Sequence, residues 1–246
     1  MFLHGGWGYE VYPFDAQIAA LETRFRVLIP DRSGYGRSPR VPSFPVGFHR
    51  DAAREMLQLL DALEIDRAAL WGHSDGAISG IWMGLEEPAR CAALILEATH
   101  YDRRKPQSRR FFERMVEEPE SFGEKFVERL VADHGDPAWR DVLAVEGRAW
   151  LEILDTAEDP DRDLYGGRLS ELAVPALVLH GADDPRTEPG EIEALTARLA
   201  AAELALIEGA GHSPHTSDAT ATSRAALPFL DRVVERALDG ESRGHR

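Results

Sequence analysis

The sequence is short of the features that mark several other classes of protein. Its 246 residues hold one cysteine, Cys91, so an internal disulfide is excluded and a reducing compartment is favoured. Asp and Glu outnumber Lys and Arg by 43 to 28, and the formal net charge of −15 argues against a nucleic-acid partner, whose phosphates would be repelled. No run of about 18 apolar residues is present to span a membrane. The first residues also lack the basic stretch and apolar run of a signal peptide. We therefore expect a cytoplasmic monomer or homodimer that acts on a small molecule, with no nucleic-acid or membrane partner.

What the chain does contain is an alternation of apolar runs and amphipathic segments. Hydrophobic residues make up 43% and charged residues 29%, which suits a folded globule rather than a disordered chain. Strand-like runs cover residues 26–29, 68–71, 92–96, 174–179 and 204–207. Helix-like segments cover residues 49–63, 77–85, 191–202 and 225–238. The alternation predicts an α/β fold, with a mostly parallel sheet and helices on both of its faces.

The pentapeptide Gly72-His73-Ser74-Asp75-Gly76 is the strongest single signal in the chain. It lies between a strand-like and a helix-like run, so it reads as a strand, a G-x-S-x-G turn and a helix. A serine in such a turn has its hydroxyl exposed at the end of a sheet, and glycines without a Cβ keep neighbouring segments clear. The pattern is short and can arise by chance, so its meaning depends on whether Ser74 has partners.

Partners for the serine follow two later strand-like runs. A serine hydroxyl is a weak nucleophile until a base takes its proton, and an acid must hold that base. One run leads into a turn that carries Asp183 and Asp184, and the next leads into a glycine-rich loop that ends in His212. Each candidate follows the carboxyl end of a predicted strand, where α/β sheets place their sites. His215 lies nearby but lacks the glycine loop before it, so we favour His212 as the base.

Two further motifs complete the set: His4-Gly5-Gly6-Trp7-Gly8, and a D-x-x-G-x-G-x-S turn over residues 31–38. With them, the chain resembles the α/β-hydrolase superfamily over almost its whole length. The resemblance implies an α/β-hydrolase fold. It also implies that the backbone N–H groups of Gly6 and Asp75 form an oxyanion hole.

The same resemblance narrows the choice of acid and implies an activity. In the family the acid stands three residues after a glycine, which selects Asp184. Asp183 remains an alternative, and so does Glu97, which holds a position where some members carry the acid. The implied protein is a serine hydrolase without cofactor or metal that cleaves a small carboxylic ester through Ser74, His212 and Asp184. Amide or peptide hydrolysis, lactone opening, C–C bond hydrolysis and perhydrolysis on the same triad are alternatives, as is a non-catalytic ligand receptor of this fold.

The strand pattern stops between residues 99 and 172. Three groups of apolar and aromatic residues at helical spacing fill this stretch. The superfamily inserts a helical cap at this place, so we divide the chain into a hydrolase core of residues 1–98 and 173–246 and a cap of residues 99–172. A cap over Ser74 would exclude water and shape the substrate pocket.

The beginning of the chain departs from the superfamily. The His-Gly loop normally follows two edge strands and a full third strand, but here only Met1-Phe2-Leu3 precede His4. A strand usually has about five or six residues. We therefore expect a stunted strand here and no first or second strand, with residues 26–29 near an exposed edge. The sequence also indicates a truncated or misassigned start, since a gap in the sheet would leave backbone groups unpaired.

Two residues are assigned to substrate binding: Trp7 in the His-Gly loop, and Asp75 in the G-x-S-x-G turn of residues 72–76, which is called the elbow below. The stretch 31–75 is similar to the valacyclovir hydrolase branch of the superfamily, in which the elbow aspartate recognises the amino group of α-amino acid esters. That resemblance implies amino acid esters as substrates. The alternative is that Asp75 caps the first turn of its helix, where the dipole favours a carboxylate by roughly 0.3 to 1 kcal/mol.

Overall fold

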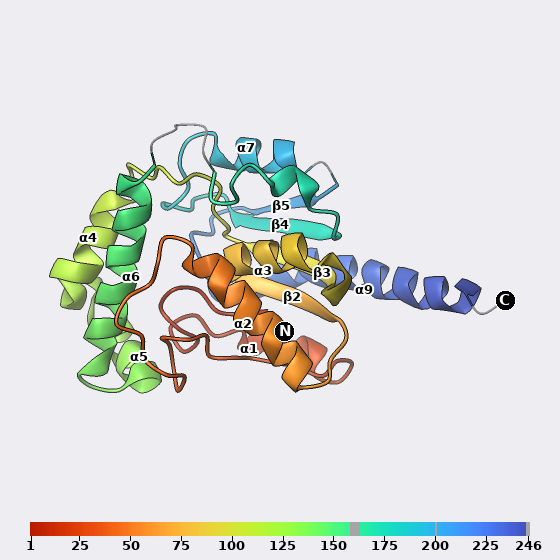
Figure 1. The fold of residues 1–246 in the computed structure, drawn as a ribbon, viewed down its shortest axis with the longest axis horizontal. Helices are drawn as coiled ribbons and strands as arrows, with labels where there is room; N and C mark the ends of the chain where they lie inside the picture. The colour runs from red at the N-terminus through yellow and green to blue at the C-terminus, as the bar shows by residue number, and fades with distance from the viewer. Residues whose placement is uncertain (158–162, 200, 245–246) are drawn as a thin grey trace.

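A five-stranded sheet forms the centre of the computed structural model, which describes residues 1–157, 163–199 and 201–244 (Figure 1). The strands lie side by side in chain order: β1 (Phe2–Leu3), β2 (Ala68–His73), β3 (Cys91–Glu97), β4 (Ala176–Gly181) and β5 (Glu203–Ile207). Every neighbouring pair is parallel. Their register places Trp71 opposite Ile95 and Ile95 opposite Leu177, so the carboxyl ends of the strands meet at one edge.

Alternating side chains along the strands build two apolar layers, one on each face of the sheet. Leu94 and Leu96 pack into one layer and Ala93 and Ile95 into the other, because successive residues of a strand face opposite ways. The first layer is covered by α2 (Phe48–Ala62), α3 (Asp75–Glu86) and α7 (Glu191–Arg198). The second is covered by α1 (Asp15–Leu21) and α9 (Ala219–Gly244), with α8 (Pro214–Ser217) leading into α9. The predicted fold class is therefore confirmed.

The strand expected at residues 26–29 is not formed, which corrects the prediction. One backbone hydrogen bond joins this segment to β1, from the Phe2 N–H to the Leu28 carbonyl over 2.8 Å. Since β1 has only two residues, it offers too few backbone groups for a longer ladder. Ile29 is 41% exposed, so the segment lies at an open edge of the sheet, as expected. β1 is the stunted strand that the sequence predicted.

The described residues between β3 and β4 form three helices that lie together beside the sheet (Figure 1). They are α4 (Arg109–Glu117), α5 (Glu124–His134) and α6 (Ala138–Asp155). α4 and α5 both pack on α6, and the rings of Phe112 and Trp150 stack across the α4–α6 contact with centroids 5.1 Å apart. Short 3₁₀ turns lie at Pro119–Phe122 and Leu169–Glu171, and a third lies at Pro88–Arg90, directly before β3. The helical character predicted for this stretch is thus present.

Candidate functional site

Ser74 lies in a sharp turn between β2 and α3, with a φ of 53° and a ψ of −119°. A positive φ strains a residue that has a Cβ, so the surrounding structure must hold it in place. Two glycines make room for the turn: a Cβ on Gly72 would collide with the backbone of Gly76, and one on Gly76 would collide with the carbonyl of Leu3. The turn therefore presents the Ser74 hydroxyl at the carboxyl end of β2, as the sequence predicted.

A chain of hydrogen bonds runs from Ser74 through His212 to Asp184. His212 Nε2 lies 3.1 Å from Ser74 Oγ, and His212 Nδ1 lies 2.8 Å from Asp184 Oδ2. Asp184 comes from the loop after β4, and His212 comes from the loop after β5. The carboxyl ends of three parallel strands thus bring together three side chains that are far apart in the sequence.

The other candidates for acid and base are engaged elsewhere. Asp183 is exposed to solvent. Glu97 is buried against His215, whose backbone N–H and Nδ1 lie 2.8 Å and 2.7 Å from Glu97 Oε1. The indole N–H of Trp71 donates to the second Glu97 oxygen over 2.8 Å. Of the three acids that the sequence left open, Asp184 is the one that the structure places on His212.

The charge states of Asp184 and His212 suit proton transfer from Ser74. Burial would raise the pKa of Asp184, but the His212 and His180 imidazoles attract its carboxylate and hydrogen-bond to it, and so hold the pKa well below its usual range. Burial lowers the pKa of His212, although Asp184 acts in the opposite sense. At neutral pH an ionised carboxylate therefore lies next to an uncharged imidazole, which can accept the proton of Ser74.

The loop after β1 lies beside Ser74 and is held in shape by two buried side chains. The Arg32 backbone N–H donates to His4 Nε2 over 3.1 Å, and the Arg32 guanidinium donates to the Gly5 carbonyl over 3.0 Å. A Cβ on Gly5 would lie only 3.3 Å from Ser74 Cβ, which shows how closely the loop approaches the elbow. His4 thus has a structural part in ordering the loop.

The two backbone N–H groups assigned to an oxyanion hole belong to Gly6 and Asp75. Among the described residues, neither N–H donates a hydrogen bond to a protein acceptor. Asp75 is the first residue of α3, where backbone N–H groups point out of the helix and its dipole favours negative charge. Gly6 has no room for a side chain, because a Cβ there would collide with the carboxyl group of Glu146 from α6.

A cavity with about 390 Å³ of empty space, its mouth included, opens beside Ser74. The elbow, the loop after β1, the loops after β3, β4 and β5, and the helices α4 and α6 all contribute to it. Its aromatic walls are formed by Trp7, Tyr12, His100, Phe111, Phe112 and Trp150. Trp7, which the sequence analysis assigned to substrate binding, stacks on Phe111 with ring centroids 5.6 Å apart and planes within 10°.

Asp75 and Glu146 form a carboxyl pair in the wall of this cavity. Asp75 Oδ1 lies 3.3 Å from His49 Nε2, and Asp75 Oδ2 is buried without a hydrogen-bond partner among the described residues. Burial would raise the pKa of Asp75, but His49 brings it down to about 2. Burial and the charge of Asp75 raise the pKa of Glu146 well above its usual range, and the Tyr35 hydroxyl donates to Glu146 over 3.0 Å. The two pKa values are shifted in opposite directions, so Asp75 is the more acidic member of the pair.

Sequence reasoning missed Glu146, although a local signal exists. The residue is the one acidic side chain on the buried face of α6, one helical turn after Leu143 and one turn before Trp150, both of which are buried. A lone carboxyl group on an apolar helix face is costly to bury unless it has a partner. Asp75 is the first residue of α3, so the dipole alternative for its carboxylate stays open, although no side-chain hydrogen bond caps this helix.

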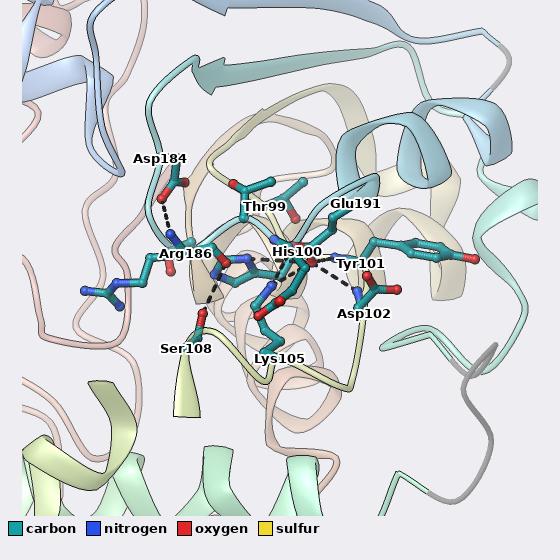
Figure 2. Close-up of polar contacts among 12 residues, drawn as sticks. Thr99, His100, Tyr101, Asp102, Lys105, Ser108, Asp184, Arg186 and Glu191 are labelled. Carbon is teal, nitrogen blue, oxygen red and sulfur yellow. Dashed lines mark hydrogen bonds and ion pairs between the residues drawn. The ribbon is translucent and has the colours of Figure 1, made fainter. Parts of the chain in front are cut away.

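A buried ion pair holds the loop that carries Asp184 against the segment that leads from β3 to α4 (Figure 2). Lys105 Nζ donates to both oxygens of Glu191, over 2.7 Å and 2.6 Å. Glu191 also accepts hydrogen bonds from the backbone N–H groups of Tyr101, Asp102 and Glu188. The partners are 86 positions apart in the chain, so no local pattern could reveal the pair.

Three further findings concern the described residues alone. No three or more His, Cys, Asp or Glu side chains among them are grouped so that they could hold a metal ion. No helix in the described part of the chain is long and apolar enough to cross a membrane. Burial raises the pKa of the Cys91 thiol to about 12, so it is not a nucleophile at neutral pH.

Comparison with known proteins places these features in a family. Residues 1–225 match the model of the alpha/beta hydrolase family. A protein of Variovorax paradoxus named as a carbamate hydrolase, RutD, is 29% identical over 253 aligned residues, covering 95% of this chain and 92% of the relative. The serine hydrolase BPHL of Mus musculus is 24% identical, with 94% of this chain and 78% of the relative covered.

Solved structures agree with this placement. A hydrolase from Pseudomonas aeruginosa is 26% identical and superposes with a TM-score of 0.66, over 93% of this chain and 88% of that chain. A thermophilic esterase from Thermogutta terrifontis is 24% identical with a TM-score of 0.70, over 94% and 89% of the two chains, and shows the shared fold. Since the family model spans most of the sequence, the chain belongs to the alpha/beta hydrolase family.

Proposed function

We propose that the protein is a serine hydrolase that cleaves small carboxylic esters through Ser74, His212 and Asp184. The observation that carries the proposal is the unbroken chain of hydrogen bonds, 3.1 Å and 2.8 Å long, that runs from Ser74 through His212 in the cavity wall to Asp184 behind it. Uncharged His212 takes the proton of Ser74 as Oγ attacks the ester carbonyl, and then gives that proton to the departing alcohol. Asp184 orients the imidazole and stabilises its charged form. Water, activated by His212 in the same way, hydrolyses the acyl-enzyme.

The backbone N–H groups of Gly6 and Asp75 would stabilise the oxyanion that forms during each attack. Both are without a protein acceptor among the described residues, so binding an oxyanion displaces no existing bond. A donor of this kind typically lowers the barrier by about 3 to 4 kcal/mol. The pair therefore supplies a large share of the rate without any cofactor.

The helical stretch within residues 99–172 acts in this proposal as a cap over the core of residues 1–98 and 173–246. Phe111 and Phe112 from α4 and Trp150 from α6 line the cavity, which supports this role. Their rings exclude water from the reacting bond and limit the size of the acyl or alcohol group. The modest volume of the cavity favours a small substrate.

Membership of the family supports hydrolase activity, whereas the choice of an ester as the bond that is cleaved is our proposal. A carbamate has an ester-like C–O bond at its carbonyl, so the name of the Variovorax relative is compatible with the same machinery. Relatives of this fold also include an enol-lactonase. Amides, lactones and carbon–carbon bonds are therefore the alternatives to be tested beside esters, and a receptor without turnover is the alternative outside enzymes.

A fluorophosphonate probe followed by a substrate panel tests the proposal. The probe should label the wild-type protein and the Ser170→Ala control, in which an exposed serine outside the cavity is removed, but should not label Ser74→Ala. A panel of short-chain para-nitrophenyl esters, a carbamate, a lactone and an anilide should then show fastest turnover for an ester. Labelling that persists in Ser74→Ala would refute the site, and binding of esters without turnover would favour the receptor.

Recognition of an amino group by Asp75 is a second candidate that concerns the substrate rather than the reaction. It is favoured by one observation: Asp75 lines the cavity as an ionised carboxylate whose Oδ2 is buried without a described partner. If it is right, α-amino acid esters are preferred over their des-amino analogues. Asp75→Ala should then lower kcat/KM far more for the amino esters. An equal loss on both kinds of ester would leave Asp75 as a structural residue.

A further inference from the structure

Arg186 brings a guanidinium group to the wall of the cavity, from the loop that follows β4. Its backbone is fixed, because its N–H donates to Asp184 Oδ1 over 2.8 Å and its carbonyl accepts from the Ser108 hydroxyl over 3.3 Å. Figure 2 shows its side chain extending away from the Lys105–Glu191 pair. The guanidinium lies on the ring of Phe111, with Cζ 3.0 Å from the ring centroid.

The guanidinium has no polar partner within the described parts of the chain. No hydrogen bond or ion pair of its nitrogens is formed there, and the Phe111 ring is its one close contact with an aromatic group. Burial lowers the pKa of Arg186 to about 10, so the group is still a cation at neutral pH. Arg186 is partly exposed, so its unpaired guanidinium donors are open to a ligand in the cavity.

The acidic groups in the cavity wall and behind it do not supply the missing partner. Asp184 is engaged by two imidazoles, and Asp75 lies against a third. Burial and its acidic neighbour raise the pKa of Glu146 well above the usual range, which disfavours its anionic form. The described carboxylates are near enough to act on the charge of Arg186, but none of them forms an ion pair with its guanidinium.

Stacking on a ring does not by itself explain such an arginine. Arg140 and Arg114 also lie over aromatic rings of the α4–α6 region, with Cζ 4.4 Å and 4.5 Å from the ring centroids. Each of these also donates hydrogen bonds to protein groups, Arg140 to two carboxylates and Arg114 to Ser121. Arg186 differs from both because it faces the cavity and has its donors free.

We propose that the substrate carries a carboxylate that binds to Arg186 while its ester carbonyl reaches Ser74. The proposal rests on the hydrolase function proposed above and specifies the substrate class as anionic esters. Two parallel N–H groups of a guanidinium fit the two oxygens of a carboxylate, and the stacked Phe111 ring holds the guanidinium plane in place. The charge of Arg186 also acts on His212, where it helps to lower the pKa, so the carboxylate lies near the reacting bond.

Two matched pairs of esters test the proposal, because the carboxylate can belong to the acyl part or to the alcohol part. The acyl pair is the mono-para-nitrophenyl ester of glutaric acid and its methyl-capped form. The alcohol pair is para-acetoxybenzoate and its methyl ester. The measured quantity is the ratio of kcat/KM for the anionic member to that for the neutral member, after subtraction of the rate with Ser74→Ala.

The wild-type protein should prefer the anionic member of at least one pair. Arg186→Met should reduce that preference by about ten- to hundredfold, as expected for a charge-assisted hydrogen-bonded pair, and Arg186→Lys should restore part of it. The matched control Arg140→Met, which removes a stacked arginine outside the cavity, should leave the ratio as it is. An anionic preference that is absent in the wild type, or that survives Arg186→Met, overturns the proposal.

A binding measurement separates this proposal from the hydrolase function. Calorimetric titration should show that glutarate binds the wild-type protein and binds Arg186→Met at least about tenfold more weakly. Equal binding to the two proteins overturns the carboxylate site even if esters are hydrolysed. If Arg186→Met weakens glutarate binding but the wild-type protein hydrolyses no ester, the carboxylate site is supported and the proposed reaction is rejected. Circular dichroism of each variant verifies that it is folded.

Discussion

Replacement of Lys105 by methionine should destabilise the protein strongly, because it leaves the Glu191 carboxylate buried without its cation. Both side chains are fully buried, and Lys105 Nζ donates to both carboxylate oxygens. Removal of one partner of a buried pair typically costs about 3 to 5 kcal/mol. Three backbone N–H groups still donate to Glu191, so the loss should lie near the lower value. For a domain of this size, about 3 kcal/mol corresponds to a fall in Tm of roughly 6 to 12 °C.

The double variant isolates the pair itself. Glu191→Gln should also destabilise, since it leaves the Lys105 ammonium buried with a neutral acceptor, whereas Lys105→Met with Glu191→Gln removes both charges and keeps one amide oxygen for the backbone donors. The double variant should therefore be more stable than the sum of the single losses by about 2 kcal/mol. Denaturation by guanidinium chloride, followed by circular dichroism, measures each free energy of unfolding.

An exposed pair with the same bidentate geometry provides the control. Arg232 donates to both oxygens of Glu203 over 2.8 Å and 2.6 Å, but the two side chains are 45% and 54% exposed. Arg232→Met should change the free energy of unfolding by no more than about 1 kcal/mol, because water screens the pair. A loss for Lys105→Met that is no larger than this, or strict additivity in the double variant, would refute the reasoning.

Three further predictions concern activity. Asp184→Asn should lower kcat by about 10⁴-fold, because the imidazole loses its anionic partner, whereas Glu97→Gln should mainly lower Tm. If steady-state assays show the larger loss of kcat for Glu97→Gln, the acid of the triad is Glu97 and not Asp184. Burial lowers the pKa of His212, and only the uncharged imidazole is a base. Therefore kcat/KM should rise with pH through that pKa and level off above it, with a midpoint below 6.5. A pH profile with a higher midpoint would contradict the assignment of His212 as the base. Gly6→Ala should lower kcat by about 10² to 10³-fold, because its Cβ collides with the buried Glu146 carboxyl group and displaces the backbone N–H of residue 6. A rate near wild type would show that Glu146 moves aside and that this N–H keeps its place.

The reacting residues could be predicted from the sequence because their chemistry constrains both residue type and spacing. The elbow needs a serine between two glycines, and the structure shows that a Cβ on Gly72 or Gly76 would collide with backbone. The choice among the acids depended on resemblance, since Asp183 and Asp184 are equivalent as residue types. The three-dimensional fold distinguishes them, with Asp184 hydrogen-bonded to His212 and Asp183 facing solvent.

What could not be predicted depends on partners that are distant in the chain. The apolar run at residues 26–29 has the composition of a strand, but its neighbour β1 is two residues long and pairs with it through one hydrogen bond. The pKa of Glu146 is raised first by burial and then by the charge of Asp75, which lies on another element. Arg186 stands in a polar turn whose sequence is typical of any surface loop, and its exposure to the cavity is set by helix α4. These contacts join residues that are far apart in the chain, so the sequence around any one of them does not reveal them.

The ion pair of Lys105 and Glu191 has a consequence for how the protein can diversify. It joins the segment between β3 and α4 to the first residue of α7, which directly follows the loop of Asp184 (Figure 2). Helices α4 and α6 lie outside the segments that the ion pair joins, and they supply cavity-lining rings. Substitutions there can reshape the cavity while the distance from His212 to Asp184 is preserved. New substrates can therefore be acquired by changes in the helices alone, with the chemistry inherited unaltered.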